Sequence, residues 1–407
     1  MTDRTDRGRV AADTDADEVA PERRDRATTV LSATLDDREA TAFVHVGTDR
    51  DPIVQYCCRT PSTVHTAVGS ALRRGSRATG SLTAVAYDGV EREWLVRSTA
   101  DESGGHPADR LAAALTERGR EGTLLAPAHI PHDAALYLEN RGFDLASTDA
   151  IERARAAKTG GERERIAAAQ QAAGAGIRQA ASLLADATVV DGRLAIPGDS
   201  GEGNDADPVP LTRARLRIAI DEAVVAAGAF PDGNTAVDPR SDADRDDTVL
   251  RPGDPIVLET TPREPAGYYG GLVRTLVVDP DGGRERRAHV AVTQSFRSAR
   301  SMLTAGAESV TAVAADLEAE VRSFGFGDGD AVETRVTGVG LEPSERPIDG
   351  GDTLDAGTVA RLDVAARVDD ETWLRIADVV AVNDEGERPD WLAAPSQSLE
   401  PAAILEE

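Results

Sequence analysis

Histidine is the side chain best suited to acid–base chemistry near neutral pH and a frequent metal ligand, and it is scarce in this chain. The six histidines are His45, His65, His106, His129, His132 and His289. Five of them lie in the first third of the sequence, so only His289 is left to serve chemistry in the remaining two thirds. It lies in the segment Arg-Arg-Ala-His-Val, where a helix is expected to begin, and we interpret it as a surface or packing residue.

Acidic side chains are abundant, and one run of them has the composition of a calcium-binding loop. Residues 242–247 read Asp-Ala-Asp-Arg-Asp-Asp. The run lacks the glycine and the distal glutamate that an EF-hand loop requires. We therefore interpret it as a solvated insertion.

The overall charge excludes some partners. Seventy-two acidic residues against 45 basic ones give a net charge of −27, and Lys158 is the only lysine. Such a surface repels phosphate backbones, so we expect no nucleic-acid partner. The composition resembles that of proteins from salt-loving archaea, the alternative being an acidic protein from a GC-rich genome. Because no apolar run reaches 18 residues and the start lacks the apolar stretch of a secretory signal, we expect no membrane span and a cytoplasmic location.

The first part of the chain predicts a small α/β domain behind a disordered acidic tail. The tail comprises residues 1–26, which hold almost no large apolar residue. Residues 27–154 then alternate between patterns typical of strands and of helices. The expected strands are 42–46, 82–87 and 124–127, and the expected helices are 107–118 and 134–141.

The second part, residues 155–385, predicts an α+β domain. Thr159 and Glu162 have the spacing of a capping box, which indicates a helix after residue 159. A second helix is expected at 211–227 and a long helical stretch at 289–323. The four expected strands are 255–258, 272–278, 358–366 and 373–382. Residues 386–407 are expected to form an irregular C-terminal tail.

Four segments, in order, resemble the motifs of one family. The first is Arg155-Ala-Ala-Lys158 with Glu162, and the second is Pro252-Gly-Asp to Glu259 with Gly267 to Thr275. The third is Thr337-Gly-Val-Gly-Leu341 with Glu345, and the fourth is Leu354, Gly357 and Asp363 with Leu374-Arg-Ile-Ala-Asp378. The family is the Xaa-Pro aminopeptidase, prolidase, creatinase and methionine aminopeptidase superfamily, and the resemblance covers residues 27–385. It implies a pita-bread catalytic domain behind a smaller creatinase-type α/β domain, and members of this family are often homodimers.

The resemblance also implies where a metal centre would lie. Peptidases of this family hold two divalent ions with two Asp, one His and two Glu, and the ions activate a shared water. The corresponding positions here are Glu259, Gly271, Thr337, Asp363 and Ala377. Asp378 cannot replace its neighbour, because adjacent side chains on a strand point to opposite faces. We therefore expect a vestigial centre and no cofactor; an active enzyme would need Mn, Co or Zn.

Further site residues follow from the same motifs. The implied substrate pocket comprises Tyr268, Tyr269, Arg274, Gly338, Gly340, Glu345 and Arg375. The remaining candidates for catalytic groups are Glu345 and Asp238, which lies near the position of an upstream histidine in metal-free creatinase-type members. A carboxylate there would need strong desolvation to act as that imidazole does.

These observations favour a catalytically inactive binding or assembly module that takes a peptide or protein ligand. Two alternatives stay open. One is an active aminopeptidase or prolidase-like hydrolase with an altered metal site that uses Glu259, Asp363 and Asp238. The other is a metal-independent, creatinase-like hydrolase. The absence of any histidine after His289 argues against both.

Overall fold

The chain divides into two compact units in the computed structural model. The first comprises the chain up to Arg155 with Thr159–Gly161, and the second comprises Ala156–Lys158 and Glu162–Glu407. The structure describes residues 16–58, 81–100, 104–198, 207–240, 248–280, 282–326, 329–348, 350–370, 372–393 and 395–406.

The first unit is built on a five-stranded sheet of order β3-β2-β1-β4-β5. The strands are β1 (Ala42–Thr48), β2 (Leu82–Asp88), β3 (Glu93–Ser98), β4 (Thr123–Ala126) and β5 (Asp144–Ser147). The helices are α1 (Ala16–Asp37), α2 (Pro52–Cys58), α4 (Pro107–Glu117), α5 (His132–Glu139) and α6 (Ala150–Ala156). Both faces of β1 and β2 are buried, which explains why these strands read as nearly continuous apolar runs.

The N-terminal tail is shorter than its composition predicted. Helix α1 begins at Ala16, so disorder for residues 16–26 was wrong, whereas residues 1–15 lie outside the described part of the chain. Charged residues dominate the first turns of α1, and this concealed the helical spacing of its buried stripe. Arg23, Ala27 and Leu31 are all buried at intervals of four residues.

The second unit is built on a seven-stranded antiparallel sheet of order β13-β15-β16-β11-β10-β9, with β17 beside β16. These strands are β9 (Thr235–Val237), β10 (Ile256–Thr260), β11 (Leu272–Leu276), β13 (Val332–Gly338), β15 (Val359–Arg367), β16 (Trp373–Ala381) and β17 (Asp390–Trp391). Two small sheets consist of β6 (Thr188–Val190), β7 (Arg193–Ile196) and β8 (Val209–Pro210), and of β12 (Glu308–Ser309) and β14 (Thr353–Leu354).

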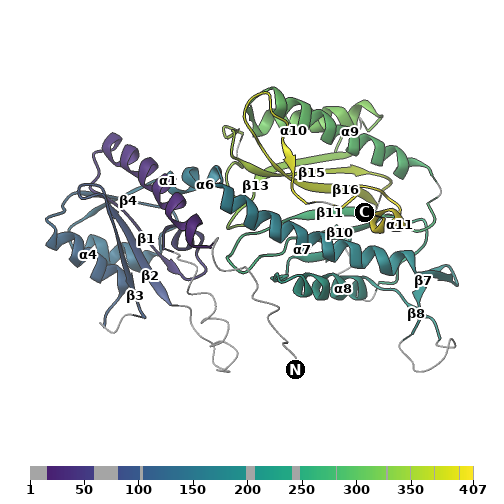
Figure 1. Ribbon diagram of the computed structural model, residues 1–407, viewed down its shortest axis with the longest axis horizontal. Helices are drawn as coiled ribbons and strands as arrows, with labels where there is room; N and C mark the ends of the chain where they lie inside the picture. Colours follow the sequence, from purple (N-terminus) through teal and green to yellow (C-terminus); the bar gives the residue numbers. More distant parts are fainter. Residues whose placement is uncertain are drawn as a thin grey trace, which may run out of the picture. The chain divides into compact units, whose positions relative to one another are not determined.

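Two pairs of helices pack against one face of the large sheet, and in Figure 1 one pair lies above its strands and the other below them. Helices α7 (Gly160–Ala185) and α8 (Arg213–Ala226) pack on β10 and β11, and α9 (Arg284–Ala305) and α10 (Val310–Ser323) pack on β13, β15 and β16. Side chains alternate between the faces of a strand. Because Leu258 and Leu362 face the helices, Glu259 and Asp363 must lie on the opposite face, which we call the site face.

Two predictions for the second unit were wrong in their details. The helical stretch 289–323 is two helices, because Gly306 interrupts it with a φ of 155°, a conformation that favours glycine. The segment after residue 385 is not an irregular tail. It adds β17 to the sheet and ends in α11 (Pro401–Leu405), whose Ile404 is fully buried.

No helix in the described ranges is both long and apolar enough to cross a membrane.

Candidate functional site

Three of the five positions that the resemblance assigned to metal ligands, Glu259, Ala377 and Asp363, share one row across the site face. Glu259 lies opposite Val273 on β11, Val273 opposite Ala377 on β16, and Ala377 opposite Asp363 on β15. The row ends at Arg335 on β13, which lies opposite Asp363. The alternation of the strands therefore brings two acidic positions of the sequence, more than 100 residues apart, onto the same surface.

Two arginines from the neighbouring rows fill the space between these carboxylates. Arg375 contacts both acids, with distances of 2.8 and 2.5 Å to Asp363 and of 2.7 and 3.3 Å to Glu259. Arg361 donates to Glu259 at 2.7 Å and to Asp363 at 3.0 Å. We call these four residues the arginine–carboxylate cluster. Its side chains are only 10–21% exposed, and its formal charge is zero.

The cluster holds its carboxylates in the ionised form. Burial alone would raise the pKa of Glu259, but the charges and hydrogen bonds of Arg361 and Arg375 outweigh it and keep that pKa below its usual range. The pKa of Asp363 is lowered for the same reasons, again against burial. Burial opposes the charge of Arg375 too, yet its hydrogen bonds to Asp363 and its attraction to Glu259 raise its pKa.

Small residues in the family's ligand positions make room for the arginines. A Cβ atom added to Gly271 would lie 3.3 Å from both Cδ and Nη1 of Arg361. Ala377 is fully buried and packs with Val257 and Val273 as an apolar floor beneath the cluster. An acidic side chain at either position would compete with a guanidinium group for the same space.

A cavity of about 370 Å³ opens beside the cluster. Its lining includes the cluster residues and also Asn234, Thr261, Arg335, Thr337 and Ser344. Arg335 has no ion-pair partner within the described ranges, and it donates a long hydrogen bond of 3.5 Å to the hydroxyl of Ser344. Three arginines against two carboxylates give the charged lining an excess of one positive charge.

The two tyrosines expected in the pocket point elsewhere. Tyr268 is buried, and its hydroxyl donates to Glu162 at 3.0 Å. The hydroxyl of Tyr269 lies 3.4 Å from Asp232, and its backbone N–H donates to the carbonyl of Gly340. Neither tyrosine lines the cavity, because both belong to the turn that leads into β11 and are fixed there by these bonds.

Glu345 is buried in an ion pair rather than directed at the cavity. Its carboxylate accepts a hydrogen bond of 2.8 Å from Lys158, and both side chains are at most 5% exposed. The pair requires glycine at position 340, since a Cβ atom there would lie 2.2 Å from the carboxylate. Gly338 is likewise needed for packing, with the carbonyl oxygen of Arg346 at 2.2 Å from an added Cβ atom.

Arg274 was expected in the substrate pocket, and the structure places it on the other face of the sheet. Its neighbour Val273 faces the site, so alternation turns Arg274 towards the helices. There it is 1% exposed and pairs with Asp378 at 2.7 Å. It also donates to the carbonyl groups of Pro395 and Ser396, which anchors the C-terminal segment.

Asp238 lies at a second cavity, of about 620 Å³, near the end of β9. It accepts hydrogen bonds from Arg213 at 3.0 Å and from the N–H of Val257 at 2.8 Å. Burial raises the pKa of Asp238, and these two partners oppose the shift. No histidine within the described ranges lines either cavity, so Asp238 has no imidazole partner there.

The motifs pointed to Arg375, whereas Arg361 and Arg335 were missed. Neither is one of the motif residues that carry the resemblance. A signal existed, because Arg361 precedes Asp363 by two residues on a predicted strand and must share its face. Arg335 also precedes Thr337 by two residues, but no strand was predicted there.

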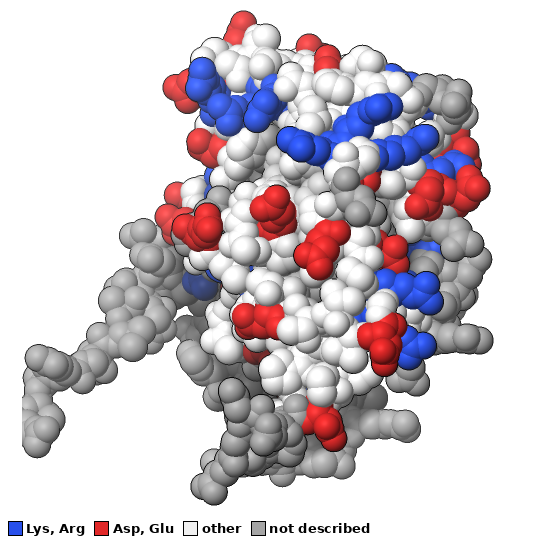
Figure 2. Space-filling model, turned by 90° about the vertical axis from the view of Figure 1, so that its right-hand side faces the viewer, with Lys and Arg blue, Asp and Glu red and all other residues white. Residues whose placement is uncertain are grey.

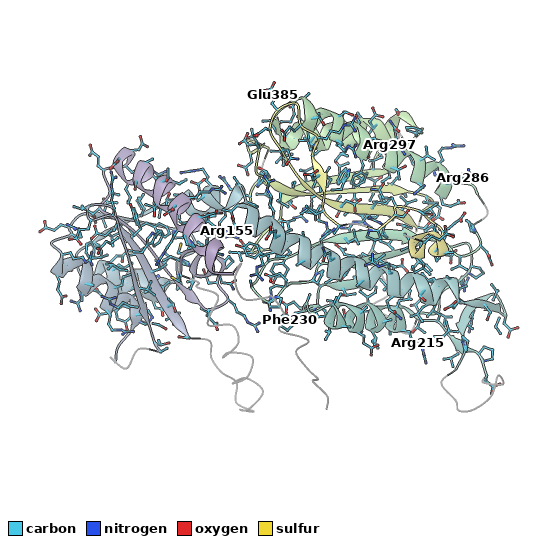
Figure 3. The ribbon with its side chains drawn as sticks, in the orientation of Figure 1. Arg155, Arg215, Phe230, Arg286, Arg297 and Glu385 are labelled. Carbon is cyan, nitrogen blue, oxygen red and sulfur yellow. The ribbon has the colours of Figure 1, made fainter. Side chains whose placement is uncertain are left out.

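Basic side chains also gather on the outer surface of α9, within an otherwise acidic chain. Figure 2 shows basic side chains gathered along the top of one side of the molecule, with acidic side chains spread below. Arg286 and Arg297 are exposed and project outward from this helix (Figure 3). They lie on the helical side of the sheet and take no part in the cavity beside the cluster.

Comparison with known proteins supports the family resemblance of the sequence motifs and the fold. Residues 218–384 match the sequence profile of metallopeptidase family M24. No curated protein matches the chain.

Several solved structures share its fold. The Xaa-Pro dipeptidase from Bacillus anthracis is 14% identical, with a TM-score of 0.69 over 93% of this chain and 99% of that one. The prolidase from Pyrococcus horikoshii is 16% identical, with a TM-score of 0.65 over 92% and 99%. The N-terminal domain of the FACT complex subunit SPT16 from chickpea is 13% identical, with a TM-score of 0.65 over 93% and 98%.

The α+β prediction is therefore confirmed, and this chain carries an M24 metallopeptidase-type domain within the two-domain fold of prolidases and Xaa-Pro dipeptidases.

Proposed function

We propose that this protein is a catalytically silent relative of the M24 peptidases that binds the carboxylate end of a peptide in the cavity beside the arginine–carboxylate cluster. The observation that carries the proposal is the position of Arg361 and Arg375. Their guanidinium groups lie between the two carboxylates that remain of the family's ligand set.

The donor set does not fit a pair of divalent ions. Gly271 and Ala377 offer no side-chain ligand, and Thr337 replaces an imidazole by a neutral hydroxyl. The two remaining carboxylates already accept hydrogen bonds from both arginines. Two divalent ions would add four positive charges to a cluster that is already neutral, with no carboxylate left to bridge them.

The cavity keeps the means to bind an anion. The guanidinium group of Arg335 forms no ion pair in the described part of the chain, and its fork geometry matches a carboxylate in two parallel hydrogen bonds. Thr337 and Ser344 place hydroxyl groups in the same lining. A cavity of about 370 Å³ is at the lower end of the range for small-molecule sites, which suits one or two amino-acid residues.

The fold itself is compatible with a role other than hydrolysis. One of the structures similar in fold is named as a subunit of the FACT complex rather than as a peptidase. A shared fold does not carry a shared activity, which depends on the residues of the site.

Manganese tests the silent character of the cluster, because Mn²⁺ prefers oxygen ligands. We expect that the full-length protein, kept in high salt, binds no Mn²⁺ and that its melting temperature does not shift when Mn²⁺ is added. Binding to the folded state alone would raise the melting temperature by mass action. A shift that disappears in Glu259→Gln would contradict the proposal.

Peptide amides test the ligand class. We expect Ala-Pro and Gly-Pro with a free carboxylate to bind without hydrolysis, and binding to weaken about tenfold when the carboxylate is amidated, which removes one charge-assisted pair. Arg335→Gln should weaken the free peptides by a similar factor, as measured by titration calorimetry.

Arg297→Gln is the matched control, because Arg297 is an exposed arginine on α9 that also has no ion-pair partner within the described ranges. It should leave peptide binding unchanged. Equal binding of amide and free acid, or equal effects of the two substitutions, would argue against a carboxylate site at Arg335.

A further inference from the structure

A group of possible metal ligands lies in the first unit, apart from the cluster of the second. Strands β1 and β4 are parallel neighbours, with Phe43 opposite Leu125. Their carboxyl ends therefore meet at one edge of the sheet, which is where open α/β sheets bind ligands. Asp51 follows the end of β1, His129 follows the end of β4, and His45 lies on β1 itself.

These three side chains already converge. One ligand atom from each of His45, Asp51 and His129 lies within 4.8 Å of the other two. Nε2 of His45 is 3.0 Å from the carboxylate of Asp51, and the rings of the two histidines are 5.6 Å apart, edge to face. The three ligands come from a strand, a helix start and a loop, and they range from buried His45 to exposed His129.

The buried histidine has an unexplained nitrogen. His45 is fully buried, and its Nδ1 has no hydrogen-bond partner within the described ranges. A buried polar atom without a partner calls for an explanation, and an ion that reorganises the surrounding groups is one.

The carboxylate of Asp51 is held in place by its neighbours. Its Oδ1 accepts hydrogen bonds from the N–H groups of Ile53 at 2.9 Å and Val54 at 3.0 Å and lies 3.0 Å from Nε2 of His45. Gly47 allows this arrangement, since a Cβ atom there would lie 2.4–2.6 Å from the side chain of Asp51.

We infer that His45, Asp51 and His129 bind one zinc ion, with water in the fourth position. Two imidazoles and one carboxylate are a usual donor set for Zn²⁺, which prefers nitrogen and oxygen at about 2.0–2.1 Å in a tetrahedron. Ligand atoms on such an ion lie about 3.3 Å apart. The three ligand atoms must therefore move closer together when the ion binds. Most of this movement falls to His129, because it is exposed on a loop and open to solvent.

The role of such an ion follows from its place. It would join the turn after β1 to the loop after β4, and thereby fix the edge of the sheet at which these two elements meet. The site is independent of the proposed function, because none of its ligands belongs to the second unit.

Zinc titration of the full-length protein in high salt tests the site. We expect one Zn²⁺ per chain in the wild type, and binding at least tenfold weaker in His129→Gln. His132→Gln is the matched control, an exposed histidine three residues away that lies outside the group. It should bind Zn²⁺ as the wild type does. Without zinc, all three proteins should have the same melting temperature, because both substituted side chains are exposed.

Three results would overturn the site. The wild type could bind no zinc, His129→Gln could bind zinc as tightly as the wild type, or His132→Gln could weaken binding as much as His129→Gln. Asp51→Asn provides a second variant, since it keeps the shape of the side chain and removes the charged ligand; it should weaken binding as well. Glu259→Gln should leave zinc binding unchanged, and a loss there would place the ion in the second unit instead.

Discussion

Replacing Arg375 with methionine is expected to lower the free energy of unfolding by about 3–5 kcal/mol at neutral pH. The substitution removes four contacts to Glu259 and Asp363 and leaves Arg361 as the only cation between two largely buried carboxylates. The cost comes from an uncompensated buried charge rather than from lost packing, because methionine keeps most of the side chain's volume. Denaturant unfolding at constant salt measures the effect.

The effect should depend on pH in a defined direction. In the wild type, the lowered pKa values of Glu259 and Asp363 contribute stability that is present above about pH 4 and is lost as the pH falls through the folded values. In Arg375→Met, burial and mutual repulsion raise these pKa values instead. The variant should therefore gain stability as the pH is lowered from 7 to 5, while the wild type stays unchanged.

Two further variants separate charge from other causes. Arg335→Met changes an arginine of the same sheet face that has no ion-pair partner within the described ranges, and should cost less than about 0.5 kcal/mol. Arg375→Met combined with Glu259→Gln should recover part of the lost stability, since it removes the negative charge of Glu259 that Arg375 no longer neutralises. A double variant no more stable than Arg375→Met would show that repulsion is not the cause.

Asp378→Ala is expected to cost a similar 3–5 kcal/mol, for a different structural reason. It leaves the guanidinium group of Arg274, which is 1% exposed on the helical face of the sheet, without its carboxylate partner. It also removes the acceptor for Gln397 and so loosens the segment that carries β17 and α11. Besides equilibrium unfolding, hydrogen exchange should become faster in residues 395–406.

The matched comparison is a surface pair. Glu318→Ala breaks an ion pair with Arg322 on α10 whose side chains are 40% and 31% exposed, and should cost less than about 1 kcal/mol. Asp378→Asn keeps the shape of the side chain and one acceptor. It should therefore lower the free energy of unfolding by an amount between those of Glu318→Ala and Asp378→Ala. A cost for Asp378→Ala no greater than that for Glu318→Ala would mean that the Arg274 pair does not stabilise the fold.

Much of the fold was open to prediction because its signals are local. Alternating apolar residues located β10, β11, β15 and β16 within about two residues, because one face of each strand packs against helices. The start of α1 was missed because its buried stripe is interrupted by charged residues that are exposed or, like Arg23, buried in spite of their charge. The C-terminal segment was missed because its order depends on Arg274 and Asp378, which lie far away in the sequence.

The candidate site was predictable only as a set of positions. The motifs placed Glu259, Asp363 and Ala377, and the strand register then put them in one row. What occupies the space above that row could not be read from motifs, because Arg361 enters from a position with no counterpart in them. Guanidinium groups of Arg361 and Arg375 occupy the space in which the family holds divalent ions, and this is visible only when the side chains of four strands are considered together.

The burial of Lys158 has a practical consequence for work on this protein. The single lysine of the chain is held against Glu345 with its side chain 1% exposed. Reagents that acylate amines, including most lysine-directed fluorophores and cross-linkers, therefore find no accessible side-chain amine on the folded protein. Acylation of Lys158 would report unfolding of the second unit, so the reaction offers a built-in probe of opening that needs no engineered residue.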